Sequence, residues 1–290
     1  MCLYSASNAT LTNSILWGNS PQEIYFNDGD NNNDASITIT YSYINGGEAG
    51  IVTNDNGTVY WEEGNINSDP LFVDPDNGDY RLSDYSPAIG AGTTAGAPST
   101  DIDGNIRPNP EGSNPDMGAY ENALGSPANA PPTITSISNV SILEDASEQT
   151  VNMAGIGDGD ASLDQTLNIT ATSSNTNLIP NPAVNYTSGE ATGQLTFTPV
   201  ADAYGTAVVT VRVEDDGGTE NGGIDTVIIS FDVAVTAVND VPTIADITDP
   251  EAILEDAGEQ TINFSGIATG AANEVQTISI TATSTDISII

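Results

Sequence analysis

The stretch ILEDASEQTVNMAGIGDGD, from Ile142 to Asp160, determines how this chain is divided. It returns as ILEDAGEQTINFSGIATGA, from Ile253 to Ala271, and matching residues are 111 positions apart. A period of roughly 100 residues suits one β-sandwich domain per repeat. The chain reaches Ile290 about halfway through the second copy. We therefore expect a β-sandwich at residues 131–240 and the N-terminal half of a second, truncated sandwich at residues 241–290.

The first repeat contains runs in which apolar and polar residues alternate. In AVVTVRVED, for example, Val209, Val211 and Val213 share one face of the expected strand. A period of two is typical of strands that are buried on one side. About seven such runs, separated by turn residues, predict a Greek-key β-sandwich. No stretch has a helical pattern, so the fold class that we expect is all-β.

The composition is strongly acidic. The chain has 41 Asp and Glu residues and only three basic ones, which gives a formal net charge of −38. This charge argues against a nucleic-acid partner, whose phosphates need cations, and against binding to an anionic membrane. No apolar run is long enough to insert into a membrane. Two interpretations of the acidic residues are open. They form a solvated surface adapted to salt, or some of them form divalent-cation sites.

The sequence lacks residue types that several kinds of catalytic site need. The chain has no His, so it has neither a Ser–His–Asp triad nor a Cys–His pair. Cys2 is the single cysteine, which excludes an intrachain disulfide. We assign no catalytic residue to this chain.

Two segments near the N-terminus match at an offset of 28 residues. They are TLTNSILWGN, beginning at Thr10, and TITYSYINGG, beginning at Thr38. Short strands that recur at this spacing fit the stacked rungs of a parallel β-helix. A sheet built from hairpins is the alternative.

A longer series follows these segments. It contains GNINSDPLFVDPDNGDYRLSDYSPAIGAG from Gly64, TDIDGNIRPNP from Thr100 and DMGAYE from Asp116. The series resembles the C-terminal part of bacterial secreted right-handed parallel β-helix proteins of the pectin-lyase-like type, although Gly90 stands where that family often has Asp. The resemblance implies that residues 1–122 are the last rungs and the cap of such a β-helix, with a linker at residues 123–130. The apolar residues expected to plug the open core are Leu71, Phe72, Tyr80, Leu82 and Tyr85.

The resemblance leaves an enzyme open as an alternative. Lyases of this fold abstract a proton with a basic residue, and only Arg81 and Arg107 are available in this part of the chain. We expect both to form structural ion pairs with nearby acids, for which the candidates are Asp79, Asp84, Asp101 and Asp103. A polysaccharide lyase or hydrolase would then have its catalytic rungs upstream, with the sandwiches as accessory modules.

Acidic residues in the repeats fall at strand ends and turns, where they resemble the calcium-binding positions of cadherin-like bacterial adhesion modules. Ca²⁺ binds six to eight oxygen atoms and accepts irregular geometry. The ligands that we expect at the junction between the two repeats are Glu144, Asp202, Asp215, Asn239 and Asp240. Asp158 and Asp160 are expected to face the N-terminal unit instead. The second repeat has Thr269 and Ala271 at the positions of that pair. Ordinary turn residues remain the alternative for all of these acids.

Together these patterns predict an extracellular or cell-surface binding and adhesion protein with β-sandwich (cadherin-like or Ig-like) repeats stiffened by Ca²⁺. A carbohydrate or a cell-surface protein is the expected kind of partner. The two alternatives are the polysaccharide-active enzyme and a structural spacer without a ligand, whose acidity is only an adaptation to salt.

Overall fold

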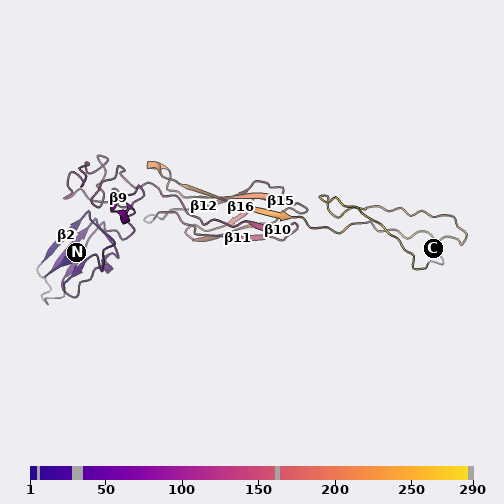
Figure 1. The fold of residues 1–290 in the computed structure, drawn as a ribbon, viewed down its shortest axis with the longest axis horizontal. Helices are drawn as coiled ribbons and strands as arrows, with labels where there is room; N and C mark the ends of the chain where they lie inside the picture. The colour runs from indigo at the N-terminus through magenta and orange to yellow at the C-terminus, as the bar shows by residue number, and fades with distance from the viewer. Residues whose placement is uncertain (5–6, 28–34, 161–163, 287–290) are drawn as a thin grey trace.

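The computed structural model describes residues 1–290 except 5–6, 28–34, 161–163 and 287–290. Its parts follow one another along an elongated body (Figure 1). The N-terminal unit lies at one end, a β-sandwich lies in the middle with its strands along the long axis, and the second repeat extends to the other end. No membrane-spanning helix is found among the described residues.

The N-terminal unit is built from short strands that stack in parallel. The central sheet joins β2 (Asn8–Thr12), β5 (Ser36–Thr40) and β7 (Thr58–Trp61). Two smaller sheets pair β1 (Cys2–Leu3) with β4 (Tyr25–Phe26), and β3 (Ile15–Leu16) with β6 (Tyr43–Ile44). A short 3-10 helix, η1 (Glu48–Gly50), precedes β7.

The register of these strands confirms the match at an offset of 28. Thr10 lies opposite Thr38, and Leu16 lies opposite Ile44. Because both pairings are parallel, the hairpin alternative is wrong for this region. The stacking buries a shared interior in which Ile24, Phe26 and Ile37 have no exposed surface.

The residues of this unit after β7, which we call the covering segment, have little regular structure and pack with Tyr43 in a second hydrophobic cluster. The strands β8 (Phe72–Asp74) and β9 (Asp79–Leu82) form an antiparallel pair around the 3-10 helix η2 (Pro75–Asn77). Leu82 is buried as expected, together with Ile89 and Met117. Tyr80 is not part of the plug, because half of its surface is exposed.

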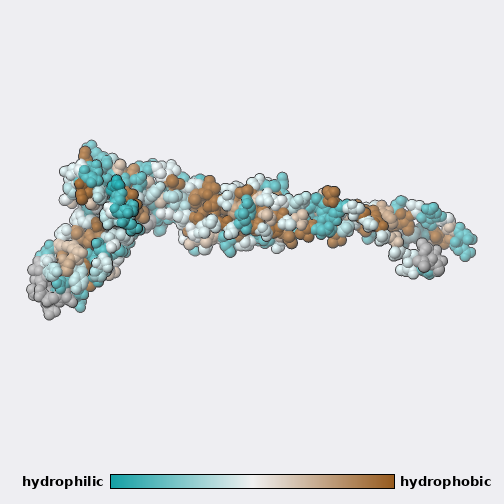
Figure 2. Space-filling model, viewed as in Figure 1, coloured by the Kyte–Doolittle hydropathy of each residue, from teal (hydrophilic) through white to brown (hydrophobic). Residues whose placement is uncertain are grey.

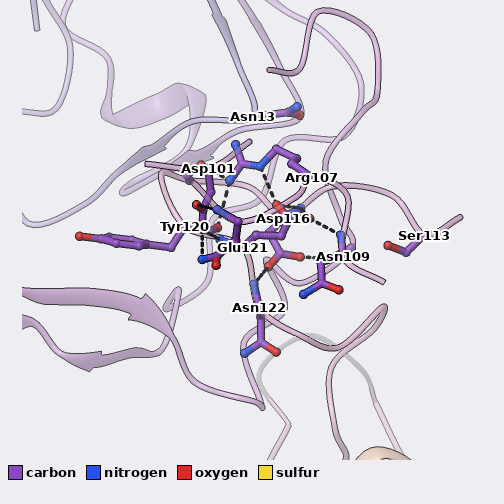
Figure 3. A network of polar contacts seen from close by, with 12 residues as sticks. Asn13, Asp101, Arg107, Asn109, Ser113, Asp116, Tyr120, Glu121 and Asn122 are labelled. Atoms are coloured by element: carbon purple, nitrogen blue, oxygen red, sulfur yellow. Dashed lines mark hydrogen bonds and ion pairs between the residues drawn. The ribbon is translucent and has the colours of Figure 1, made fainter. Parts of the chain in front are cut away.

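The covering segment is held together by one buried ion pair. The Arg107 Nε atom lies 2.6 Å from Glu121 Oε2, and both side chains are almost fully buried. The Arg107 guanidinium also donates to the carbonyl oxygens of Gly118 and Tyr120 (Figure 3). The second oxygen of Glu121 accepts from the backbone N–H of Asn109. The predicted structural role of Arg107 is therefore confirmed, but its partner is Glu121 and none of the acids expected from the sequence.

Two further carboxylates complete this network. Asp116 accepts hydrogen bonds from the backbone N–H groups of Gly90 and Asn122. Burial raises the pKa of the Asp116 carboxyl to about 6, against the lowering effect of those hydrogen bonds. Asp101 closes a tight turn by accepting from the N–H groups of Asp103 and Asn105.

The β-sandwich consists of seven strands in two sheets. The larger sheet has the order β10 (Val140–Leu143), β16 (Thr226–Thr236), β15 (Gly205–Glu214), β12 (Asn168–Ser173). The smaller sheet has the order β11 (Gln149–Ala154), β14 (Thr192–Phe197), β13 (Ala183–Asn185). All pairings are antiparallel except that of β10 with β16. The 3-10 helix η3 (Glu220–Gly222) lies in the turn between β15 and β16.

The alternating pattern predicts the buried face of the sandwich correctly. Val209, Val211 and Val213 on β15 are completely buried, and they pack with Leu195 and Phe231 in one core. Burying each of these valines contributes roughly 1.5–3 kcal/mol to folding. The core holds the two sheets together and so fixes the loops at both ends of the sandwich.

The second repeat begins as the first one does. Thr243 forms an antiparallel bridge with Ala268, as Thr133 does with Gly157. Among residues 241–286, however, no strand longer than such a bridge is found. Phe264 is 44% exposed, whereas Met153, its counterpart in the first repeat, is 1% exposed. Hydrophobic side chains accordingly lie open along the narrow C-terminal part of the molecule (Figure 2).

We expect Arg107→Met to destabilise the N-terminal unit by about 3–5 kcal/mol, because it leaves the Glu121 carboxylate buried without its counter-charge. The measurement is urea unfolding followed by tryptophan fluorescence, since Trp17 and Trp61 both lie in this unit. Arg81→Met is the matched control. It breaks the ion pair with Asp79, in which the Arg81 side chain is 63% exposed, and it should change little. Equal effects of the two variants would contradict a structural role for the buried pair.

Candidate metal centre

Three loops meet where the sandwich joins the second repeat. The strand β10 ends at Leu143, directly before Glu144, and Leu143 lies opposite Thr236 at the end of β16. The neighbouring strand β15 begins at Gly205, opposite Val235, so the turn before β15 ends here as well. This pairing brings the predicted residues Glu144, Asp202 and Asp240 to the same end of the sandwich. We call this group of acids the junction cluster; it consists of Glu144, Asp145, Asp202, Asp240 and Glu274.

Two contacts tie the second repeat to this end. Glu144 is buried, and its carboxylate accepts from the backbone N–H of Val238 at 2.6 Å and from the Asn273 amide at 2.8 Å. The backbone N–H of Asp240 donates to Glu274 Oε1 at 2.8 Å. Carboxylates from both repeats therefore lie at one junction. The predicted ligand Asn239 bonds only locally, from its amide to the carbonyl oxygen of Asp240.

The centre of the junction cluster is a group of three carboxylates. Oxygen atoms of Asp145, Asp202 and Asp240 all lie within 4.8 Å of one another. Asp145 and Asp202 adopt left-handed backbone conformations, with φ of 60° and 57°, which Asp tolerates better than most residues. The Asp145 carboxylate accepts from the N–H of Asp202 at 3.2 Å, which holds the two turns together.

The junction cluster has no positive counter-charge. Each of the three arginines of the chain is paired elsewhere, with Asp79, Glu121 and Glu214. Burial raises the pKa of the Asp240 carboxyl above its ordinary value, and the nearby charges of Glu274, Asp145, Asp202 and Glu144 raise it further. A cation would relieve this repulsion.

Buried oxygen atoms test whether a cation fits. Asp240 Oδ2, Glu274 Oε2 and Asn273 Oδ1 are buried and have no hydrogen-bond partner within the described part of the chain. Buried polar atoms are nearly always partnered in folded proteins. All the atoms concerned are carboxylate or amide oxygens, the ligands that hard cations such as Ca²⁺ prefer. The residues present therefore fit a Ca²⁺ ion.

A second group, of three acids and two amides, lies at the opposite end of the sandwich, next to residues 123–130. We call it the linker cluster; its members are Asn129, Asp158, Asp160, Gln165 and Asp215. The Asn129 amide donates to Asp215 Oδ1 at 2.8 Å, and the Gln165 amide donates to Asp160 Oδ2 at 2.7 Å.

The linker cluster repeats two properties of the junction cluster. Asp215 Oδ2 and Gln165 Oε1 are buried without a hydrogen-bond partner among the described residues. Burial raises the pKa of Asp160 and of Asp215 above the ordinary value. Asp160 lies beside residues 123–130, because the Ala130 N–H donates to Asp160 Oδ2 at 3.4 Å.

The sequence-based grouping of Asp215 with Asp240 is wrong. Asp202 precedes β15 and Asp215 follows it, so the ten residues of this strand lie between them. An extended strand of that length spans about 33 Å. One ion therefore cannot bind both residues, and Asp215 belongs to the linker cluster.

Sequence reasoning missed several members of both clusters. Asp145 is adjacent to Glu144 in the repeated Glu-Asp pair, which was a usable signal. Asn129 lies three residues before Pro132 in the first repeat, and Asn239 lies three residues before Pro242 in the second. This equivalence was a second usable signal. Asn273 and Glu274 had no such signal, because the first repeat has Ser162 and Leu163 at their positions.

Comparisons with known proteins give only distant similarities. No protein-family model and no curated protein matches the sequence. Domains 4 and 5 of the S-layer protein SbsC align with 37% of this chain and 54% of their own length, at 20% identity and a TM-score of 0.24. The titin domains z1z2, solved in complex with telethonin, align with 40% of this chain and 53% of theirs, at 15% identity and a TM-score of 0.27.

The cadherin-like domains 1 to 4 of zebrafish RET are a third neighbour. They align with 46% of this chain and 33% of their own length, at 13% identity and a TM-score of 0.23. With TM-scores this low, none of these similarities assigns a family or a function to the chain.

We expect Asp240→Asn to raise the melting temperature of the sandwich in chelator, because the neutral amide removes one charge from an uncompensated cluster. In saturating calcium the variant should melt at a lower temperature than the unchanged protein, since it lacks the negatively charged carboxylate of Asp240 as a ligand. Melts followed by circular dichroism measure both effects. Asp76→Asn, which removes an exposed carboxylate from η2, is the charge-matched control. A lower melting temperature of the Asp240 variant in chelator would contradict this account.

Proposed function

We propose that this chain is part of an extracellular surface or adhesion protein whose sandwich repeats are stiffened by Ca²⁺. One observation carries the proposal. The junction cluster combines carboxylates from both repeats with buried oxygens that have no hydrogen-bond partner among the described residues, and it has no positive charge. A cation bound there would hold ligands from both sides of the junction. It would thereby restrict how the second repeat moves against the first.

The ligands that we propose for the junction are Asp145, Asp202, Asp240 and Glu274, with Glu144 and Asn273 as the residues that connect the repeats. Asn239 stays a candidate through its side-chain oxygen, while its amide nitrogen donates to the carbonyl oxygen of Asp240. The linker cluster is the proposed second site, with Asp158, Asp160 and Asp215 as its acids. Extracellular calcium modules bind Ca²⁺ with a Kd of about 10⁻⁴–10⁻³ M. Sites of that affinity would be occupied only outside the cell.

We further propose that residues 1–122 are the last rungs and cap of a right-handed parallel β-helix. Three parallel pairings support this proposal, since β1 with β4, β2 with β5 and β3 with β6 stack one segment on the next. Isolated parallel bridges from Tyr25 to Val52 and from Tyr43 to Ile66 extend two of these stacks by another layer. In a surface protein such a unit would present a binding face, and the sandwiches would space it from its anchor.

The stiffening role is tested by the distance between two spin labels across the junction. Labels are placed at exposed positions of β16 and of the second repeat, with Ser230→Cys and Thr281→Cys in a Cys2→Ser background. We expect calcium to narrow the distribution of distances, and a magnesium salt at matched ionic strength to leave it broad. Asp240→Asn should abolish the narrowing, whereas Asp76→Asn should retain it. A distribution that is equally broad with and without calcium would refute the stiffening role.

A further inference from the structure

The N-terminal unit carries an open groove of about 660 Å³ that neither acidic cluster uses. One wall is the segment from Asn13 to Asn19, which contains β3. The other wall comes from the β8–β9 pair and from the covering segment around Tyr120. A volume of this size is typical of sites that bind small molecules or short polymers.

The groove is neutral in a chain that is otherwise strongly acidic. None of its lining residues is Asp, Glu or Arg, although the chain has 41 acids. Four of the lining residues are aromatic, namely Trp17, Phe72, Tyr80 and Tyr120. The groove therefore offers apolar ring faces, and none of its lining side chains carries a formal charge.

Two of the four aromatic rings pack against each other. Phe72 and Tyr80 pack edge to face, with ring centroids 5.4 Å apart and an interplanar angle of 87°. Tyr120 points away from the Arg107–Glu121 network, whose bonds fix its backbone (Figure 3). Because the Phe72 and Tyr80 rings already pack against each other, a ligand would lose little conformational entropy on binding against this pair.

Two residues connect the walls of the groove to the rest of the unit. The buried Asn13 amide donates to the carbonyl oxygen of Thr93 at 2.7 Å and accepts from the N–H of the same residue at 2.8 Å. A side chain at Gly118 would come within 2.9 Å of the Ile15 side chain, so glycine keeps the two walls at their present distance.

The rings also carry polar tips that are free to bond. The Trp17 indole N–H and the hydroxyl groups of Tyr80 and Tyr120 have no hydrogen-bond partner among the described residues. Tyr and Trp are typical of interfaces in which one face is apolar and the edge is polar. A matching ligand has flat apolar faces and a rim of hydroxyl groups, which is the chemistry of a pyranose ring.

We propose that this groove binds a neutral oligosaccharide, with Trp17 and Tyr80 as stacking platforms. The net charge of −38 opposes an anionic polysaccharide, and a cationic ligand would favour the acidic surface over an uncharged groove. This inference rests on the surface-binding role proposed above, because it names the class of partner. It involves no residue of the junction or linker clusters, so calcium stiffening and sugar binding can fail separately.

The test is calorimetric titration of the whole chain with cellohexaose, laminarihexaose, xylohexaose and mannohexaose, and with polygalacturonate as the anionic comparison. We expect saturable binding of at least one neutral sugar and none of polygalacturonate. Trp17→Ala and Tyr80→Ala should each weaken binding roughly tenfold or more, as expected for aromatic anchors. Tyr60→Ala is the matched control, because Tyr60 is as exposed as Tyr80, at 50%, and lies outside the groove.

Tryptophan fluorescence tests whether the sugar binds in the groove, independently of the affinities of the alanine variants. In a Trp61→Phe variant Trp17 is the single tryptophan, and its emission should change along the same binding curve. The Tyr80 variant keeps the proposal testable if Trp17→Ala fails to fold, since Tyr80 is half exposed. The proposal is overturned if no neutral sugar binds more tightly than about 1 mM. It is equally overturned if Tyr80→Ala binds as tightly as Tyr60→Ala.

Discussion

Unbalanced negative charge is the constraint on which the rest of this structure depends. The three arginines are all engaged in ion pairs, and only that of Arg107 with Glu121 is buried. The remaining carboxylates stay in water, accept backbone N–H groups as Asp116 does, or gather where a cation can join them. The sandwich provides such places at its two ends, because β10, β15 and β16 begin or end there and direct their flanking acids into common loops.

Much of the fold follows from local patterns. The offset between Thr10 and Thr38 predicts the parallel register of β2 and β5, because the strand in each copy of the pattern pairs with the strand in the next copy. Alternation in Val209, Val211 and Val213 predicts a buried strand face. The partner of Arg107 could not be predicted in the same way. Many acids surround it in the sequence, and only the folded covering segment brings Glu121 to it.

The candidate sites were only partly predictable. Glu144, Asp202 and Asp240 meet because they lie at strand ends, and the sequence marks those ends well. The misplacement of Asp215 was avoidable, since a ten-residue strand separates it from Asp202. The groove was not predictable, because Trp17 and Tyr80 come from distant segments and only the packing of the N-terminal unit brings them together. Tyr80 in particular resembles a core residue in the sequence and is half exposed in the structure.

The most direct test of the account is a calorimetric calcium titration of the chain, with magnesium at matched ionic strength as the reference. We expect saturable binding at about 10⁻⁴–10⁻³ M or tighter. A substitution in the junction cluster should weaken it, and so, separately, should one in the linker cluster. Heats that do not saturate, or that magnesium reproduces in full, would contradict it. In that case the acids of both clusters would be a solvated surface, and the junction between the repeats would be flexible.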